Sequence, residues 1–204
     1  MAEAVTGSVM FCDVCDYTHK CILNGSEIAL TTLCTVFNSF DAFLDECGVI
    51  KVGTIGDAYM VVCIGADRHA ERVMRFAERA LATAMANGVD VRIGVSSGPF
   101  LRASFGTPHA TSYYGNTVNK ASRMESSGFR NCIRLARSTM LLLVENGADP
   151  DSFANCGVHE VKSYGFIPMY ITKHGDWEEC VRYTSEKSTR RRSVDDQSLK
   201  RHTL

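Results

Sequence analysis

The sequence predicts a mixed α/β (α+β) fold in which helices cover a mainly antiparallel sheet. Two observations predict it. Short apolar runs typical of strands alternate with longer segments of helical periodicity, and several strands come in pairs joined by glycine-bearing turns. The composition, 45% hydrophobic and 22% charged, supplies enough apolar material for a core and argues against global disorder. The 204 residues therefore fit one domain of good size.

The first half of the chain is expected to fold in the order strand, helix, hairpin, helix. These elements are the strand Val5–Cys12, the helix Ser26–Cys47, the hairpin strands Val49–Val52 and Ala58–Ile64, and the helix Arg68–Ala86. The first helix follows from apolar residues at helical spacing, which are Leu30, Leu33, Val36, Phe37, Phe40, Phe43 and Leu44. The hairpin follows from the two glycines of the turn Gly53–Asp57. The second helix is alanine-rich and ends at Asn87-Gly88.

The second half is expected to contain two pairs of strands and two helices. These are the strand pair Val89–Ser96 and Phe100–Phe105, the helices Gly115–Ser126 and Ser138–Asn146, and the late strands Val158–Val161 and Met169–Thr172. From Ser185 onward the sequence is basic and almost free of core-forming residues. The predicted organisation is a short leader over residues 1–6, a domain over 7–175 and a disordered basic tail over 176–204.

Charge, hydropathy and cysteine content exclude several classes of protein. The net charge of -1 gives no reason to expect binding to nucleic acid. No apolar stretch approaches the roughly 18 residues of a membrane span, and no signal peptide is recognisable. Nine scattered cysteines, an odd number, suit a reducing cytosol better than a disulfide framework. We therefore expect a cytoplasmic protein, either on its own or as the cytosolic domain of a larger, membrane-attached one.

Two acidic turns are candidates for a metal site. Asp13 ends the first predicted strand, and Asp57 stands at the tip of the glycine-bearing hairpin. Two carboxylates that converge at strand ends could hold a pair of Mg²⁺ ions, which prefer carboxylate and phosphate oxygens and can organise a displacement at phosphorus. From spacing alone, the alternative that both are ordinary turn-forming residues is favoured.

The predicted helix Gly115–Ser126 is the third candidate. Asn119 and Arg123 are four residues apart and share one face of it. An amide and a guanidinium on a rigid helix can orient a ribose and neutralise the charge that builds on a phosphoryl group. Without further information, a solvated polar stripe is again the more frequent explanation.

The combination of motifs changes this balance. The segments FCDVCDYT, KVGTIGDAYMVV, VRIGVSSGP and YYGNTVNKASRMES follow one another in this order, and together they resemble the catalytic domain of class III adenylate and guanylate cyclases. The resemblance covers roughly residues 7–175. It implies a ferredoxin-like βαββαβ core and a head-to-tail homodimer with active sites between the protomers. The implied reaction is attack of the ribose 3′-oxygen on the α-phosphorus of a nucleoside triphosphate, which yields a 3′,5′-cyclic nucleotide and pyrophosphate.

The resemblance assigns roles to individual residues. Asp13 and Asp57 match the aspartates that bind two Mg²⁺ (or Mn²⁺) ions, with the carbonyl of Val14 as a further ligand. Asn119 matches the ribose-positioning asparagine, and Arg123 matches the transition-state arginine. Because one chain carries both sets, a homodimer is expected to assemble two complete sites. Tyr17 and Thr18 of the first motif are expected to contact the substrate.

The positions that select the base depart from the family pattern. ATP-using relatives usually have lysine at the position of Gly53 and aspartate at that of Ser112, whereas GTP-using relatives have glutamate and cysteine. Gly53 offers no carboxylate to the N–H donors of guanine, while the Ser112 hydroxyl can accept from the adenine amino group. We therefore favour ATP. GTP remains an alternative, because the sequences of the motifs KVGTIGDAYM and NKASRMES resemble guanylate cyclases at least as much as adenylate cyclases.

The phosphate-binding end departs as well. The segment VKSYG resembles a late KGKG-like motif, in which Lys162 is kept and Tyr164 stands where a second lysine is common. Lys162 is therefore expected to bind the triphosphate. These departures also leave open a catalytically silent, cyclase-like regulatory module. The intact Asp13, Asp57, Asn119 and Arg123 argue for the enzyme.

Overall fold

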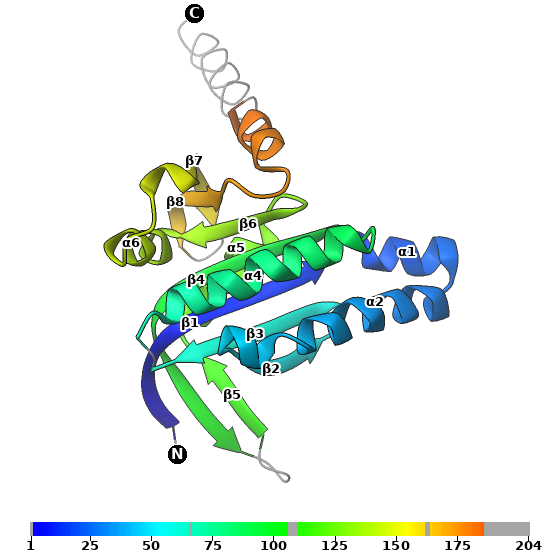
Figure 1. The fold of residues 1–204 in the computed structure, drawn as a ribbon, viewed down its shortest axis with the longest axis horizontal. Helices are drawn as coiled ribbons and strands as arrows, with labels where there is room; N and C mark the ends of the chain where they lie inside the picture. Colours follow the sequence, from blue (N-terminus) through cyan, green and yellow to red (C-terminus); the bar gives the residue numbers. More distant parts are fainter. Residues whose placement is uncertain (1, 66, 106–109, 162–163, 186–204) are drawn as a thin grey trace, which may run out of the picture.

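A sheet of eight strands forms the centre of the molecule (Figure 1). The computed structural model describes residues 2–65, 67–105, 110–161 and 164–185. The strand order is β2-β3-β1-β4-β6-β8-β7, and β5 pairs with β4. The strands are β1 (Ala2–Val14), β2 (Ile50–Ile55), β3 (Ala58–Ile64), β4 (Val91–Phe105), β5 (Ala110–Tyr114), β6 (Cys132–Ala136), β7 (Phe153–Val161) and β8 (Gly165–Thr172).

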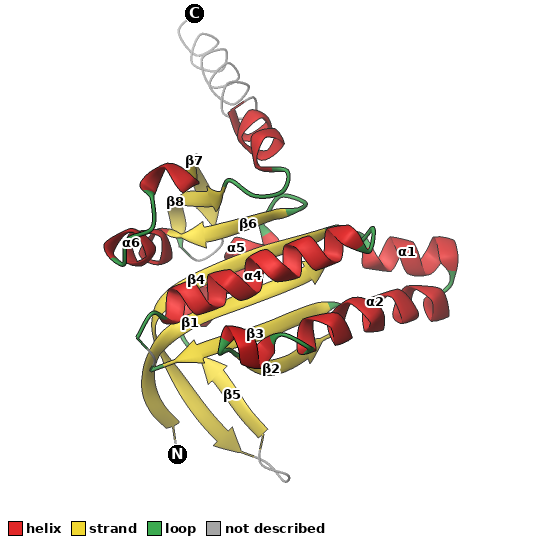
Figure 2. Cartoon of the chain, in the orientation of Figure 1, coloured by secondary structure: helices red, strands yellow, loops and turns green. Residues whose placement is uncertain are grey.

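Helices cover both faces of this sheet (Figure 2). They are α1 (Tyr17–Asn24), α2 (Ser26–Asp41), α3 (Leu44–Cys47), α4 (His69–Ala86), α5 (Asn116–Ser126) and α6 (Arg137–Glu145), with a short 3₁₀ turn η1 (Pro150–Ser152). Helices α2 and α4 pack on one face of the central strands, and α5 packs on the opposite face. Residues 177–185 are also helical.

The first four strands and their helices confirm the predicted ferredoxin-like core. The chain runs β1-α2-β2-β3-α4-β4, and these strands are ordered β4-β1-β3-β2 with every neighbouring pair antiparallel. β6 joins the outer edge of β4 in parallel, and β8 and β7 continue the sheet with antiparallel pairing. The sheet is therefore mainly antiparallel, as the sequence predicted.

The alternation of side chains along β1 explains why this strand lies at the centre. Met10 and Cys12 point to the face covered by α2 and α4, where Phe40 and Phe76 complete the main core. Val9 and Phe11, which alternate with them, point to the other face and belong to the cluster that includes residues of α5. Because both faces of β1 are covered, apolar residues are required at successive positions.

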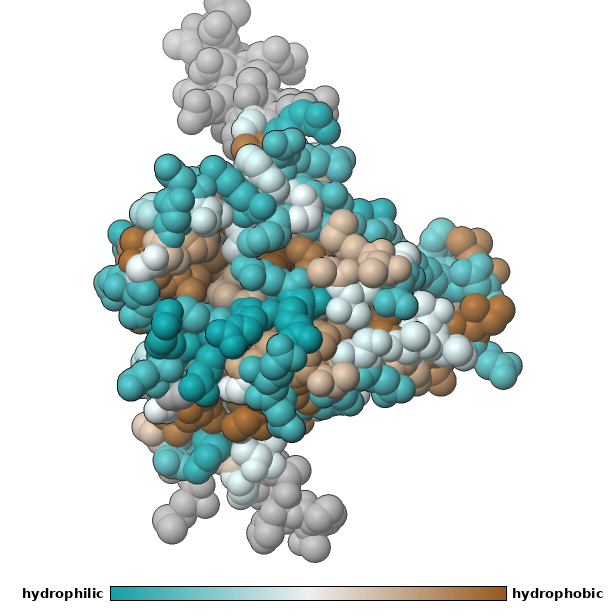
Figure 3. Space-filling view, viewed as in Figure 1, coloured by the Kyte–Doolittle hydropathy of each residue, from teal (hydrophilic) through white to brown (hydrophobic). Residues whose placement is uncertain are grey.

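The region between β1 and β2 differs from the prediction. A single helix was expected over Ser26–Cys47, but α2 ends at Asp41 and α3 begins at Leu44. Helix α1 was not predicted, and none of its residues is buried, so it lacks the apolar face that periodicity detects. Leu30, expected in the core, is 52% exposed. In Figure 3 apolar side chains gather at the outer end of α1 and α2, where Ile22 and Leu23 are exposed.

The strand pair predicted on either side of Gly98-Pro99 is wrong. β4 is one continuous strand of 15 residues that pairs with β1 throughout this region, including Thr6 with Pro99. On its other edge β4 meets β6 at Arg92–Val95 and β5 at Leu101–Phe105. Pro99 lies between these two contacts, where a missing backbone N–H disrupts no ladder. β5 and β6 were not predicted.

The structure has regular elements on both sides of the predicted domain 7–175. Residues 2–6, expected to be a leader, belong to β1 and pair with β4. Residues 177–185, expected to belong to a disordered tail, are helical, and Cys180 is fully buried beside Trp177 and Val181. The remaining predicted tail, residues 186–204, lies outside the described residues.

No described helix is long and apolar enough to cross a membrane. All nine cysteines are free.

Candidate active site

The two candidate metal ligands lie side by side at one end of the central strands. Asp13 is the second-last residue of β1 and pairs with Ala58, the first residue of β3. Asp57 immediately precedes Ala58 in the hairpin turn. The backbone N–H of Val14 donates to the carbonyl oxygen of Asp57 over 3.4 Å. The pairing of β1 with the β2–β3 hairpin therefore brings together two carboxylates that are 44 positions apart in the sequence.

Electrostatics link these carboxylates to each other. Partial burial raises the pKa of Asp13, and the negative charge of Asp57 raises it further. The guanidinium of Arg92 opposes both effects, because its Nη2 donates to Asp13 Oδ2 over 2.5 Å. Because the charge of Asp57 acts on Asp13, a cation placed near both carboxylates is favourable.

Arg92 and Glu125 complete this cluster, and sequence reasoning missed both. Arg92 Nε donates to Glu125 Oε1 over 3.1 Å, so the arginine bridges β1 and α5. Burial raises the pKa of Glu125, with a further contribution from Asp13, whereas Arg92 lowers it. Arg92 lies within the segment VRIGVSSGP, where a charged residue in an otherwise apolar strand was the available signal.

The donor set fits Mg²⁺ or Mn²⁺. Carboxylate oxygens are the ligands that these hard cations prefer, and Mg²⁺ is commonly held by one or two carboxylates together with substrate phosphates. Among the described residues, no group of three or more His, Cys, Asp and Glu side chains could hold a metal ion. Backbone carbonyls, such as that of Val14, and the substrate itself would therefore supply the remaining ligands.

Asn119 and Arg123 lie on α5. The inner face of this helix packs on the sheet through Val118, Ala121 and Met124. Asn119 is exposed and Arg123 is half-buried on the outer face. Within the described part of the chain, no hydrogen bond or ion pair joins either residue to Asp13 or Asp57. The candidate residues thus belong to different elements, the carboxylates to the ends of β1 and of the β2–β3 turn, and the amide and guanidinium to α5.

The predicted substrate contacts fall at several places. Burial, a hydrogen bond to Cys21 and the negative charge of Asp57 all raise the pKa of Tyr17. Tyr17 therefore lies near Asp57. Thr18 is exposed in the first turn of α1. Gly53, in β2, has a φ of 156°, and a Cβ built there would meet no atom within 4 Å. Ser112 is half-buried in β5 and pairs with Ala103.

At the phosphate-binding end, Lys162 lies outside the described residues. Tyr164 is described, and its side chain contacts α5. Its hydroxyl donates to the carbonyl oxygen of Asn116 over 3.4 Å, and the Nζ of Lys120 lies 5.6 Å from the centroid of its ring.

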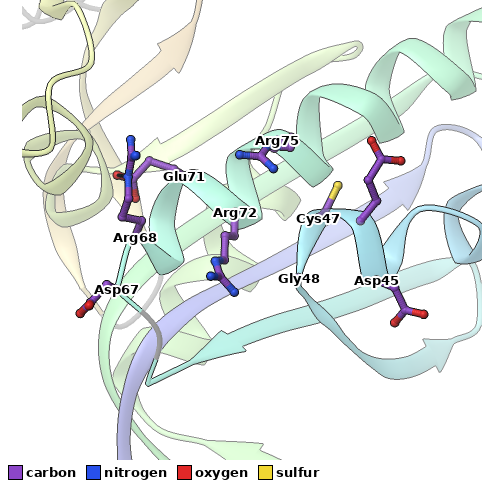
Figure 4. Close-up of a pocket in the computed structure, with 9 residues that line it drawn as sticks. Asp45, Cys47, Gly48, Asp67, Arg68, Glu71, Arg72 and Arg75 are labelled. Carbon is purple, nitrogen blue, oxygen red and sulfur yellow. Dashed lines mark hydrogen bonds and ion pairs between the residues drawn. The ribbon is translucent and has the colours of Figure 1, made fainter.

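A pocket of about 400 Å³ lies elsewhere, between α3 and the first turns of α4 (Figure 4). None of the predicted site residues lines it. Its lining consists of Asp45, Glu46, Cys47, Gly48, Asp67, Arg68, Glu71, Arg72 and Arg75. Acidic and basic side chains nearly balance, and Arg68 already pairs with Glu71 over 3.0 Å. This pocket has no charge preference that would select a ligand.

Comparison with protein families gives one match that covers most of the chain. The family described as the adenylate and guanylate cyclase catalytic domain matches residues 2–174. The rat protein "Guanylate cyclase soluble subunit beta-2" is 30% identical over 180 residues, 83% of this chain and 26% of the relative. The Dictyostelium discoideum protein "Adenylate cyclase, germination specific" is 30% identical over 174 residues, 77% of this chain and 20% of the relative. The chain thus spans between a fifth and about a quarter of the length of these relatives.

Solved structures with the same fold include nucleotide complexes. The guanylate cyclase domain of RhGC from Catenaria anguillulae, in complex with GTP, is 28% identical and superposes with a TM-score of 0.73, covering 86% of this chain and 99% of that domain. A guanylyl cyclase domain of the RhoGC fusion protein from Blastocladiella emersonii, described as a non-canonical dimer, is 27% identical, with a TM-score of 0.70, and the match covers 86% of this chain and 99% of that domain. A monomeric structure of that domain is also known.

Proposed function

Because this chain belongs to the adenylate and guanylate cyclase catalytic domain family, we propose that it converts a purine nucleoside triphosphate to the 3′,5′-cyclic nucleotide and pyrophosphate. A bond forms between the ribose 3′-oxygen and the α-phosphorus as the bond from that phosphorus to the oxygen bridging to the β-phosphate breaks. The hydroxyl proton is released, and pyrophosphate leaves. The observation that supports this function best is that β1 and the β2–β3 hairpin bring Asp13 close to Asp57 at the end of the central strands.

Asp13 and Asp57, with the carbonyl of Val14, would hold two Mg²⁺ or Mn²⁺ ions. Such ions supply Lewis acidity, which favours loss of the 3′-hydroxyl proton and stabilises the leaving phosphates. The protein contributes by holding the two carboxylates in position. Asp13 is fixed twice, by the β1–β3 pairing and by the hydrogen bond from Arg92.

Asn119 and Arg123 act from α5 in this proposal. The amide of Asn119 orients the ribose, so that the 3′-oxygen lies in line with the bond that breaks. The guanidinium of Arg123 donates to the phosphate oxygens on which negative charge builds. The packing of α5 against β4 keeps both side chains on a rigid element.

We propose a homodimer with shared sites, in which one protomer supplies Asp13 and Asp57 and its partner supplies Asn119 and Arg123. The exposure of Asn119 and the partial exposure of Arg123 on the outer face of α5, where a partner protomer could reach them, support this arrangement. Exposed large apolar side chains on β2 and β4, among them Ile50, Ile55 and Leu101, supply surface that association would cover. The free cysteines suit action in the cytosol, either as a separate protein or as the cytosolic part of a membrane-attached one.

For the base, we propose ATP. The reason is chemical: Gly53 provides no acceptor for the N–H donors of guanine, and leaving such donors unpaired in a buried site costs about 1–3 kcal/mol. GTP is the second candidate, and the several guanylate cyclases among the similar proteins favour it.

The decisive experiment incubates the purified full chain with Mn²⁺ or Mg²⁺ and either ATP or GTP, at protein concentrations that allow dimers to form, and measures cyclic nucleotide. A larger kcat/KM with ATP supports the proposed base, and a larger value with GTP supports the second candidate. Asp57→Asn is the matched inactive control. If neither nucleotide yields product, the chain is instead a silent regulatory module.

A further inference from the structure

The outer face of α5 carries one cation that the proposed mechanism does not use. At about 100° per residue, Asn116, Asn119, Lys120 and Arg123 fall on a single stripe of the helix, away from the buried Val118 and Ala121. Lys120 is next to Asn119 in sequence and one turn before Arg123. A ligand that touches Asn119 and Arg123 therefore lies within reach of the Lys120 side chain.

Tyr164 holds this lysine in place. The Lys120 Nζ lies 5.6 Å from the centroid of the Tyr164 ring, a distance typical of a cation–π contact. The Tyr164 hydroxyl donates to the carbonyl oxygen of Asn116 in the first turn of α5. The tyrosine thus bridges the β7–β8 hairpin to α5, and its ring forms one wall beside the ammonium group.

Lys120 has no acidic partner in the described part of the chain, where the ion pairs involve other lysines and arginines. The face of an aromatic ring attracts an ammonium group electrostatically but does not replace an oxygen acceptor for its N–H groups. The three N–H donors of Lys120 Nζ therefore stay available for an anion. Lysine is suited to this, since its compact charge on a flexible stem binds phosphate readily.

We propose that Lys120 binds the polyphosphate tail of the substrate, and that Tyr164 positions it. This inference rests on the proposed function. It gives a physical reason for finding tyrosine at position 164. The positive charge is carried on α5, beside the arginine that meets the reacting phosphate, and the aromatic ring stabilises it there. The residue at 164 then needs no charge of its own.

Binding of inorganic tripolyphosphate to the full chain in the presence of Mn²⁺ tests the proposal without any turnover. Lys120→Met is expected to weaken binding, measured by calorimetry, by ten- to a hundredfold, because a hydrogen bond to a charged group contributes about 1.5–3 kcal/mol. Lys173→Met is the matched control. Lys173 also lies over an aromatic ring, that of Trp177 at 5.5 Å, and should bind as the unchanged chain does.

A relocated charge should rescue the loss. In the Lys120→Met background, Tyr164→Lys is expected to restore tripolyphosphate binding to within a few fold, whereas Tyr164→Phe is expected to restore nothing. Thermal unfolding of each variant checks that it folds. The proposal is overturned if Lys120→Met binds tripolyphosphate as tightly as the unchanged chain does.

Turnover separates this proposal from the proposed function. If the chain makes cyclic nucleotide, Lys120→Met should raise the KM for the triphosphate more than it lowers kcat, and Lys120→Arg should recover most of the loss. If Lys120→Met has cyclase activity with an unchanged KM, the proposed role of Lys120 is wrong and the proposed cyclase function stands. If the chain shows no cyclase activity, but tripolyphosphate binding still depends on Lys120, the proposed cyclase function is wrong and the role of Lys120 in anion binding stands.

Discussion

At the scale of single residues, Arg92 is the counter-ion of two carboxylates, those of Asp13 and Glu125. It is the cation between Asp13 and Glu125, and its side chain is one-third exposed while theirs are mostly buried. Without it, three carboxylates, those of Asp13, Asp57 and Glu125, would influence one another with no compensating charge. Arg92 therefore opposes the rise in the pKa of Asp13 that burial and Asp57 cause, and its hydrogen bond orients the Asp13 carboxylate.

Arg92→Met should lower the free energy of unfolding by about 1–3 kcal/mol, because it leaves two partly buried carboxylates without their charged donor. Urea denaturation measures the change. Arg130→Met is the matched control, since Arg130 also bridges two acidic residues, Asp16 and Asp90, but is 52% exposed. It should cost less than about 1 kcal/mol. Equal losses for the two variants would contradict this role of Arg92.

His69 should make the stability depend on pH. Its Nδ1 lies 2.8 Å from the Oγ of buried Ser8, which is hydrogen-bonded in turn to Ser97, and burial lowers the pKa of His69. The folded state then binds fewer protons than the unfolded state. The contribution of His69 is fully present above a pH of about 6.5, the unfolded value, and is lost as the pH falls through the lower folded value.

Denaturation at pH 7 and at pH 5 tests this. The free energy of unfolding should fall between these values in the unchanged chain and fall less in His69→Asn, whereas His19→Asn, at an exposed position of α1, should follow the unchanged chain. A His69→Asn variant with the full pH dependence would exclude His69 as its source.

The same scale shows what could be predicted of the site. Asp13, Asp57, Asn119 and Arg123 belong to local motifs, so the sequence alone made them candidates. The salt bridges of Arg92 join residues 79 and 33 positions apart, and no local spacing encodes such contacts. The side-chain roles assigned by resemblance stay predictions until variants are measured.

At the scale of elements, the contact of α5 with β4 depends on Gly94. A Cβ at this position would lie 2.1 Å from the backbone nitrogen of Glu125 and 2.4 Å from the carbonyl oxygen of Ala121. A glycine is therefore required for the helix to approach the strand this closely. The approach also sets the height of Asn119 and Arg123 above the sheet.

Gly94→Ala should move α5 outward, lower the free energy of unfolding by about 1–3 kcal/mol, and reduce kcat of the proposed reaction. Ser122→Ala, on the same helix, is the control that should change neither quantity by much. Denaturation and turnover measure the two effects. Full activity in Gly94→Ala would mean that the position of α5 is not limiting.

Elements with a strong pattern were predicted well, and those without one were not. Helix α4 was predicted to within one residue at its start because its apolar residues follow the helical period. β6 was missed, since Arg134 interrupts a five-residue apolar run, yet this arginine is buried and donates to the Ser127 carbonyl. β4 was split because Gly98-Pro99 is typical of a turn, and only the pairing with β1 overrides that signal.

At the scale of the whole molecule, shared active sites predict complementation. Asp57→Ala and Arg123→Ala should each be inactive alone. When mixed, they should recover up to about a quarter of the unchanged activity, because half of the dimers formed at random are mixed and each of these has one intact site. Cyclic nucleotide production measures the recovery. No recovery, in a mixture shown to form mixed dimers, would contradict the shared arrangement.

The helical residues 177–185 should be part of the stable unit. A chain that ends at residue 185 should unfold at the same temperature as the full chain. One that ends at residue 176 exposes the cluster that Trp177 and Cys180 cover and should lose about 2–5 kcal/mol of unfolding free energy. Thermal unfolding compares the two. Equal stability of both truncated chains would return the domain boundary to the predicted residue 175.

The central position of β1 also has a consequence for synthesis. β1 is the first strand of this chain to leave the ribosome, but its partners are far downstream: Gly7 pairs with Ile64, and Ala2 pairs with Ala103. At about 5–20 residues per second, roughly 5–20 seconds separate the emergence of β1 from that of β4. Until β3 emerges both edges of this apolar strand are open, and until β4 emerges one edge remains exposed to other nascent chains. Its protection by a chaperone, rather than any step of local folding, should therefore limit the yield of native protein.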